Sequence, residues 1–128
     1  MNLLLDTHIL LWAANGSLPE KAEEIISNLD NRLFFSSSAI WEVSIKNELG
    51  RADFKVDPLS LYQGLIASGY EELPVTGRHT LVLSSLPQIH KDPFDRIMLA
   101  QALVEGLTFL TSDETVAKYP SSILYISS

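Results

Sequence analysis

Short apolar runs alternate along the chain with segments in which apolar residues recur every three or four positions. Runs of the first kind are typical of buried strands, and the second spacing is typical of helices that bury one face. Helices are therefore predicted between the strands, with a further short one over residues 113–118. The strands are predicted over residues 3–5, 33–35, 72–75, 108–111 and 123–126.

Capping residues, proline and glycine mark the ends of several predicted helices. Asp57-Pro58 and Asp92-Pro93 each place a capping residue before a proline, which is the order found at helix starts. Gly106 follows the last apolar positions of the helix that Asp92 opens, and glycine is common just beyond a helix end. These signals make the helix after Asp92 the clearest element in the sequence.

A further helix is predicted after the second strand, with Ser38 as its expected N-cap. Trp41, Ile45 and Leu49 recur there every four residues, which indicates an apolar stripe, and Gly50 is expected to end the helix.

The alternation of strands and helices predicts an α/β fold in which a mainly parallel sheet is covered by helices on both faces. The pattern shows no repeat and no linker, so one domain over residues 1–128 is expected. In such sheets, ligands bind beyond the carboxyl ends of the strands, near the point where the strand order reverses. This rule predicts the position of a functional site before any residue is considered.

Composition narrows the chemistry that such a site can use. The 128 residues include no cysteine, which excludes disulfides, thiolate zinc sites and cysteine nucleophiles. The apolar N-terminal run is interrupted by Asp6 and His8 and lacks the basic start of a signal peptide. It is also shorter than the roughly 20 apolar residues that span a bilayer. We therefore expect a cytoplasmic protein without a membrane anchor.

The net charge of −7, from 16 acidic and 9 basic residues, argues against a protein that holds nucleic acid mainly by neutralising phosphates. An acidic protein can still act on a phosphodiester if its carboxylates bind divalent cations, because bound cations reverse the local potential. A nucleic-acid function would therefore require a cluster of acids.

Four acidic residues occupy positions near the expected site: Asp6, Glu42, Asp95 and Asp113. Asp6 directly follows the first strand, and Asp113 comes just after the fourth. Carboxylates that converge repel one another unless a cation lies between them, and oxygen-rich sites suit Mg²⁺ or Mn²⁺. The four residues are therefore candidate metal ligands.

Structural roles are the alternative for each acid. Asp95 can be a first-turn acid that interacts with the helix dipole, with Asp92 as the N-cap. Asp113 can cap its own short helix, and Glu42 can simply form an i,i+4 ion pair with Lys46. Asp6 is harder to explain in this way, because an uncompensated charge at the end of an apolar strand costs several kcal/mol.

Four segments together resemble the successive motifs of PIN-domain ribonucleases, in the order and at the separations usual for that family. They are Leu3-Leu4-Leu5-Asp6-Thr7-His8, residues 36–46, His90-Lys91-Asp92-Pro93-Phe94-Asp95-Arg96 and Leu110-Thr111-Ser112-Asp113. The chain is most similar to the VapC-like toxins of type II toxin–antitoxin systems. Each motif alone is weak, and the ordered set is strong.

The resemblance implies a five-stranded parallel sheet and a Mg²⁺- or Mn²⁺-dependent endoribonuclease whose acidic cluster is Asp6, Glu42, Asp95 and Asp113. It also implies RNA as the substrate, an antitoxin protein as a partner, and a homodimer. Asp92 is an additional acid of this variant and is expected outside the direct ligands.

Other polar residues near the motifs are weaker candidates. Thr7, Thr111 and Ser112 can hydrogen-bond the carboxylates, water or phosphate, or serve in ordinary turns and caps. Lys46 is a candidate for contact with the acids or the substrate, and Arg96 can contact RNA or a neighbouring acid. The three histidines share no metal-ligand spacing, and no role is assigned to them.

Two other functions are compatible with an α/β chain of this kind. A phosphatase of the haloacid-dehalogenase type uses an aspartate after the first strand, but it also requires a second aspartate two residues on, where this chain has His8. A PIN fold without activity, serving as a binding module, predicts no response to Mg²⁺ or Mn²⁺.

Overall fold

A computed structural model describes residues 1–50 and 55–127 of the chain. Within these residues, five parallel strands form one sheet in the order β3-β2-β1-β4-β5. The fold class predicted from the sequence is therefore confirmed, including the five parallel strands. The strands are β1 (Asn2–Leu5), β2 (Arg32–Ser36), β3 (Glu71–Leu73), β4 (Thr108–Thr111) and β5 (Ile123–Tyr125).

Helices connect successive strands, and two single 3₁₀ turns complete the described elements. Asp57 caps α4 and Asp92 caps α6, and in both helices a proline follows in the first turn, as predicted. The helices are α1 (Thr7–Asn15), α2 (Glu20–Ser27), α3 (Ser37–Glu48), α4 (Pro58–Ala67), α5 (Gly77–Val82) and α6 (Pro93–Glu105), and the turns are η1 (Leu83–Ser85) and η2 (Val116–Lys118).

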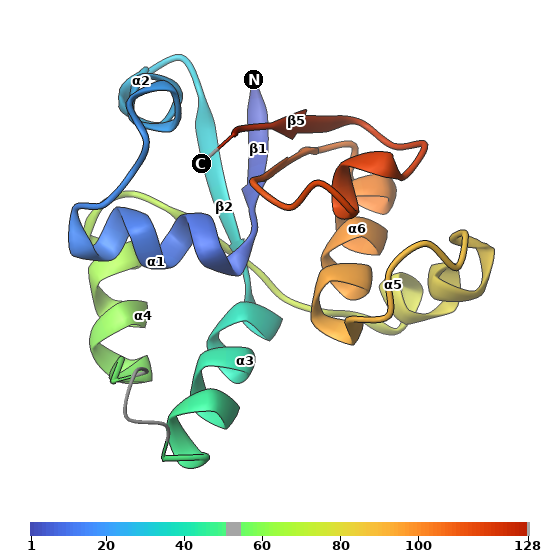
Figure 1. Cartoon of the computed structure of the whole chain (residues 1–128), viewed down its shortest axis with the longest axis horizontal. Coiled ribbons are helices and arrows are strands. Elements are labelled where there is room, and N and C mark those ends of the chain that lie inside the picture. The colour runs from blue at the N-terminus through green and yellow to red at the C-terminus, as the bar shows by residue number, and fades with distance from the viewer. Residues whose placement is uncertain (51–54, 128) are drawn as a thin grey trace.

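The strand order reverses at β1. The chain proceeds from β1 through β2 to the edge strand β3 and then crosses back to β4 on the other side of β1. Right-handed crossovers in opposite directions bring the connecting helices to both faces of the sheet. In Figure 1, α1, α2 and α4 lie to the left of β1, and α5 and α6 lie to its right. The carboxyl ends of β1 and β4 are thus the expected place for a site.

The centre of the sheet is apolar on both faces. Leu3, Leu4 and Leu5 of β1 are fully buried, as are Phe109 and Leu110 of β4. Near-continuous apolar strands of this kind are what a parallel sheet covered on both sides requires. The central strand β1 and its neighbour β4 are therefore embedded in the apolar core, and the residues that follow them extend from that core.

Helix α3 differs from the expectation in two respects. Its N-cap is Ser36 rather than Ser38, and the Ser36 hydroxyl accepts a hydrogen bond from the Ser38 amide at 3.0 Å. The helix buries Ala39, Glu42 and Val43, whereas Trp41 is 62% exposed. The face with Glu42 thus turns inward because α1, α4 and α6 contact α3 there.

The short helix expected over residues 113–118 is present only as the turn η2. Asp113 precedes this turn and accepts hydrogen bonds from the amides of Thr115 and Val116. The segment forms only one turn because Pro120 follows closely and disfavours a longer helix, and β5 begins soon afterwards.

Candidate metal centre

Asp6 lies at the junction of β1 and α1 and is 4% exposed. It caps α1, because its Oδ1 accepts a hydrogen bond from the Ile9 amide at 2.9 Å, while Oδ2 accepts one from the Thr111 hydroxyl. Burial raises the pKa of this carboxyl group, and the hydrogen bonds from Thr111 and Ile9 only partly offset that effect. An ionised Asp6 therefore lacks the stabilisation that water would provide.

Glu42 reaches the same region from α3 and is 6% exposed. Its Oε1 accepts a hydrogen bond of 2.6 Å from the Thr7 hydroxyl at the start of α1. Its Oε2 lies 3.0 Å from Nζ of Lys46, which is the i,i+4 ion pair that the spacing predicted. Glu42 is thus both paired within its helix and tied to the end of β1.

Asp92 and Asp95 lie at the start of α6. Oδ1 of Asp92 accepts hydrogen bonds from the amides of Phe94 at 2.8 Å and Asp95 at 3.2 Å. Asp95 is mostly buried, and its Oδ2 is 2.8 Å from Nε2 of His90. Burial, followed by the charges of Asp92 and Asp6, raises the pKa of Asp95 to about 7 despite the opposing effect of His90.

Asp113 follows β4 and faces Asp95 across the switch point. Its Oδ1 accepts hydrogen bonds from the amides of Thr115 at 2.8 Å and Val116 at 3.2 Å. Its own amide donates to the Thr111 hydroxyl at 3.0 Å. Because that hydroxyl also donates to Asp6, Thr111 joins the two acids that end the central strands.

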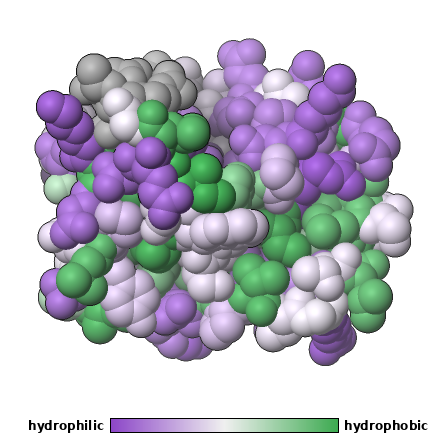
Figure 2. All heavy atoms as spheres, turned by 90° about the horizontal axis from the view of Figure 1, so that it is seen from below, coloured by the Kyte–Doolittle hydropathy of each residue, from purple (hydrophilic) through white to green (hydrophobic). Residues whose placement is uncertain are grey.

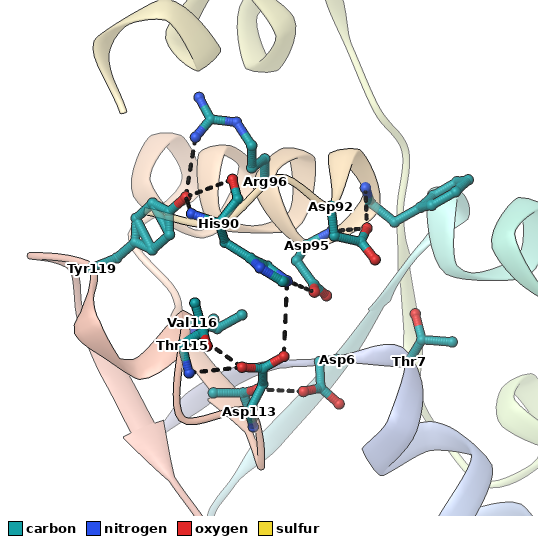
Figure 3. Close-up of polar contacts among 12 residues, drawn as sticks. Asp6, Thr7, His90, Asp92, Asp95, Arg96, Asp113, Thr115, Val116 and Tyr119 are labelled. Carbon is teal, nitrogen blue, oxygen red and sulfur yellow. Dashed lines mark hydrogen bonds and ion pairs between the residues drawn. The ribbon is translucent and has the colours of Figure 1, made fainter. Parts of the chain in front are cut away.

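These side chains line a cleft of about 140 Å³. The close-up in Figure 3 shows Asp6 and Asp113 entering it from the strand ends and Asp95 from α6, with His90 above them. All four acids that the sequence singled out meet here, together with the weaker candidates Thr7, Lys46 and Asp92. The full lining is Asp6, Thr7, His8, Glu42, Lys46, His90, Asp92, Asp95 and Asp113.

Three weaker candidates do not line the cleft. Thr111 lies beneath it and acts through its hydrogen bonds to Asp6 and Asp113. Ser112 is half-buried, and its backbone favours the ionised form of Asp6, which lowers the pKa of that group. Arg96 donates to the carbonyls of Pro87 and Leu83 and to the Tyr119 hydroxyl instead of contacting an acid. Arg96 thus fastens the segment that precedes α6.

His8 and His90 both line the cleft although the sequence assigned no role to either, and His90 is the one that contacts Asp95. It lies 5 residues before Asp95, outside the helix, and its ring reaches back over the first turn of α6. The sequence signal that could have identified His90 is its position just before the capped start of α6, since the first turn of that helix carries Asp95.

The donor set fits a divalent cation. Carboxylates from β1–α1, α3, α6 and the end of β4 converge in one cleft, and burial raises the pKa of both Asp6 and Asp95. Ligand atoms of His90, Asp95 and Asp113 all lie within 4.8 Å of one another. Ligands on opposite sides of a cation with bonds of about 2.1 Å are separated by about 4.2 Å, so small side-chain rotations suffice. A cation would remove the cost of ionising these acids together.

A larger groove lies beside the cleft, between α3, α5 and α6, with a volume of about 390 Å³. Trp41 and Phe94 contact each other along it, with ring centroids 5.2 Å apart. Figure 2 views the molecule from below and shows hydrophobic side chains exposed among hydrophilic ones. The groove offers few polar atoms, so the acidic cleft is the place for ionic chemistry.

The sheet order and the acidic cluster at its carboxyl edge define an α/β protein with an acidic cleft at the switch point. The chain belongs to the PIN-domain family, whose sequence pattern matches residues 3–121. No curated protein sequence matches the chain significantly. Within residues 1–50 and 55–127, no helix combines the length and the apolar character needed to cross a membrane.

Solved structures share the fold at low sequence identity. One similar chain comes from the structure of VapBC2 from Rickettsia felis bound to a DNA fragment from its promoter. The TM-score is 0.75 at 18% sequence identity, and the match covers 99% of this chain and 100% of that one. DNA-bound VapBC from Salmonella typhimurium gives 0.71 and 18%, with 98% of each chain covered. VapBC-5 from Mycobacterium tuberculosis, a toxin–antitoxin system, gives 0.64 and 19%, covering 99% of this chain and 98% of that one.

Proposed function

We propose that this chain is a metal-dependent endoribonuclease that uses Mg²⁺ or Mn²⁺ to hydrolyse RNA phosphodiester bonds. The observation that carries the proposal is the convergence of Asp6, Glu42, Asp95 and Asp113 in one cleft at the switch point of the sheet. Acids whose pKa is raised by burial and by one another are common at functional sites. The PIN-domain pattern over residues 3–121 supports the same conclusion.

A divalent cation held in the cleft supplies Lewis-acid chemistry, which activates water and neutralises the charge that develops on a phosphate. The protein contributes the geometry. Asp6 is held by the Ile9 amide and the Thr111 hydroxyl, and Asp113 by two backbone amides, so neither carboxylate has to be ordered when the cation binds. Because the chain is acidic overall, the carboxylates of the cleft would have to be neutralised by the cation for the cleft to attract the RNA backbone.

Glu42 differs from the other acids of the cluster in that a lysine side chain is one of its partners. The Thr7 hydroxyl and Lys46 hold it in place. Lys46 also brings a positive charge to the rim of the cleft. We propose that Glu42 would help to hold the cation and that Lys46 would contact the phosphate of the substrate.

The biological role that we propose is the toxin of a type II toxin–antitoxin pair, acting in the cytoplasm as a homodimer. The support is that the structural neighbours named above come from VapBC complexes. An antitoxin protein would then be the natural partner of this chain. Coexpression with the product of an adjacent short reading frame, followed by copurification, tests the pairing directly.

The activity is tested by incubating purified protein with single-stranded and structured RNAs in Mg²⁺, Mn²⁺ or EDTA. Cleavage is expected only with a divalent cation. Glu42→Gln and Asp113→Asn should lose most of it, whereas Glu23→Gln, on the exposed surface of α2, should keep it. Circular dichroism first establishes that the three variants are folded.

Two results would contradict the proposal. Cleavage that persists in excess EDTA, with contaminating nucleases excluded, would rule out metal dependence. Equal activity of all three variants would show that the cluster is not catalytic. A folded chain with neither cleavage nor a cation response would instead favour a PIN fold that serves as a binding module.

A further inference from the structure

The imidazole of His90 lies between two carboxylates of the acidic cluster. Its Nε2 is 2.8 Å from Oδ2 of Asp95 and 3.8 Å from Oδ2 of Asp113. One donor atom from each of these three residues lies within 4.8 Å of the others. His90 is therefore placed as a ligand would be, and not merely at the rim of the cleft.

The segment that carries His90 is fixed independently of the acids. The Tyr119 hydroxyl accepts a hydrogen bond from the His90 amide at 2.9 Å and donates one to the His90 carbonyl at 3.3 Å. Arg96 donates to the same hydroxyl at 3.0 Å and to the Pro87 carbonyl at 2.8 Å. Tyr119 is itself buried, so its hydroxyl anchors the backbone of His90 to the body of the protein. The backbone that carries the imidazole is thus held in place without any contribution from the acids.

Both acids direct one carboxylate oxygen towards this imidazole. Backbone amides bind Oδ1 of Asp113, and it is Oδ2 that faces His90. Asp95 likewise directs Oδ2 at Nε2. The group combines one nitrogen and two carboxylate oxygens from two segments of the chain, residues 90–95 and Asp113. This arrangement resembles part of a coordination sphere, and it opens into the acidic cleft.

We propose that His90 is a direct metal ligand together with Asp95 and Asp113, and that the site consequently prefers Mn²⁺ to Mg²⁺. The inference rests on the proposed cation-dependent function and deepens it. Mg²⁺ favours oxygen ligands and retains much of its water, whereas imidazole nitrogen suits transition-metal ions. A nitrogen ligand therefore adds affinity for Mn²⁺ and little for Mg²⁺.

The alternative role for His90 is to orient Asp95 through a hydrogen bond alone. Glutamine separates the two roles, because its amide can donate a hydrogen bond to Asp95 but is a weak ligand for Mn²⁺. His8 provides the matched control, since it lines the same cleft on the exposed side and does not belong to the group of three. The variants for comparison are thus His90→Gln and His8→Gln.

The first measurement is calorimetric titration of the metal-free full chain with Mn²⁺ and, separately, with Mg²⁺. The wild type is expected to bind Mn²⁺ at least about tenfold more tightly than Mg²⁺, and His90→Gln to lose about tenfold in Mn²⁺ affinity with little change for Mg²⁺. His8→Gln should match the wild type. An unchanged Mn²⁺-to-Mg²⁺ ratio in His90→Gln would overturn the inference.

The second measurement needs no folded variant at position 90. Electron spin echo envelope modulation of Mn²⁺ bound to the wild type should show coupling to a ¹⁴N nucleus, replaced by ¹⁵N coupling when the chain carries ¹⁵N-labelled histidine. The coupling should persist in His8→Gln. Tight Mn²⁺ binding and RNA cleavage without nitrogen coupling would refute the His90 ligand and leave the proposed function standing. Failure of the wild type to bind either cation would refute both.

Discussion

Replacing Asp95 with asparagine should stabilise the metal-free protein at neutral to alkaline pH. The carboxyl group lies at the buried start of α6, where burial and the charges of Asp92 and Asp6 raise its pKa from 3.8 to about 7. Asparagine has nearly the same shape, and its oxygen can still accept the hydrogen bond from His90. The substitution therefore removes mainly the charge.

The sign follows from the direction of the pKa shift. Between the unfolded value of 3.8 and the folded value of about 7, the folded chain retains a proton that the unfolded chain has lost. The contribution of the Asp95 carboxyl group to the free energy of unfolding is thus fully present below pH 3.8 and is lost as the pH rises through about 7. A shift of about three units corresponds to about 4 kcal/mol, of which about 2 kcal/mol is lost between pH 5.5 and pH 8.

Urea unfolding in EDTA at these two pH values is the assay. The advantage of Asp95→Asn over the wild type should be larger at the higher pH by about 2 kcal/mol. Comparing the two pH values removes any constant effect of the new amide. Asp57→Asn is the control, because Asp57 likewise lies at a helix start, as the N-cap of α4, but the hydrogen bond from Ser60 lowers its pKa, so no such gain is expected.

Addition of Mn²⁺ should reverse the order, because the cation stabilises the wild type more than a variant that lacks one carboxylate. The reasoning is refuted if the difference between Asp95→Asn and the wild type in EDTA stays the same at both pH values. It is also refuted if the variant is the less stable protein at the higher pH. Either result would mean that His90 already stabilises Asp95 as an anion.

Three further predictions follow from the same contacts. Asp6→Asn should keep the cap to the Ile9 amide and remain as stable as the wild type in EDTA near pH 8. It should lose RNA cleavage and most of the rise in melting temperature that Mn²⁺ causes. A melting temperature well below that of the wild type in EDTA would contradict this prediction. Thr7→Val should release Glu42, lower the unfolding free energy by about 1 kcal/mol in urea and weaken cleavage. Phe109→Ala should cost about 3 to 5 kcal/mol in the same assay, and a loss below about 1 kcal/mol would show that β4 is not central to the core.

Local signals were enough for several elements. Asp57-Pro58 and Asp92-Pro93 open α4 and α6 as predicted, because a cap and a proline act within one turn. The apolar runs of β1 and β4 likewise identified the central strands. Helix α3 was harder, since the recurrence of Trp41 and its neighbours did not mark the buried face. Which face of α3 is buried depends on the positions of the helices that pack against it, α1, α4 and α6.

The candidate site was predictable to the extent that it depends on strand ends. Asp6 directly follows β1, Asp113 lies two residues beyond the end of β4, and parallel strands end at the same edge of a sheet. Glu42 and Asp95 were identified by the resemblance to the PIN family, since their positions on helices also allowed purely structural roles. His90 was missed because its place depends on Tyr119, which lies 29 residues further along the chain.

The sequence by itself determined the order of strands and helices, the parallel sheet and the four acids, because these depend on periodicity, capping and ordered motifs. Only the tertiary structure decided which side chains share the cleft, that Arg96 serves the fold, and that the pKa of Asp6 and Asp95 is raised. The physical reason is that burial and electrostatic coupling depend on distances through space. Those distances are set by packing between segments that the linear sequence keeps far apart.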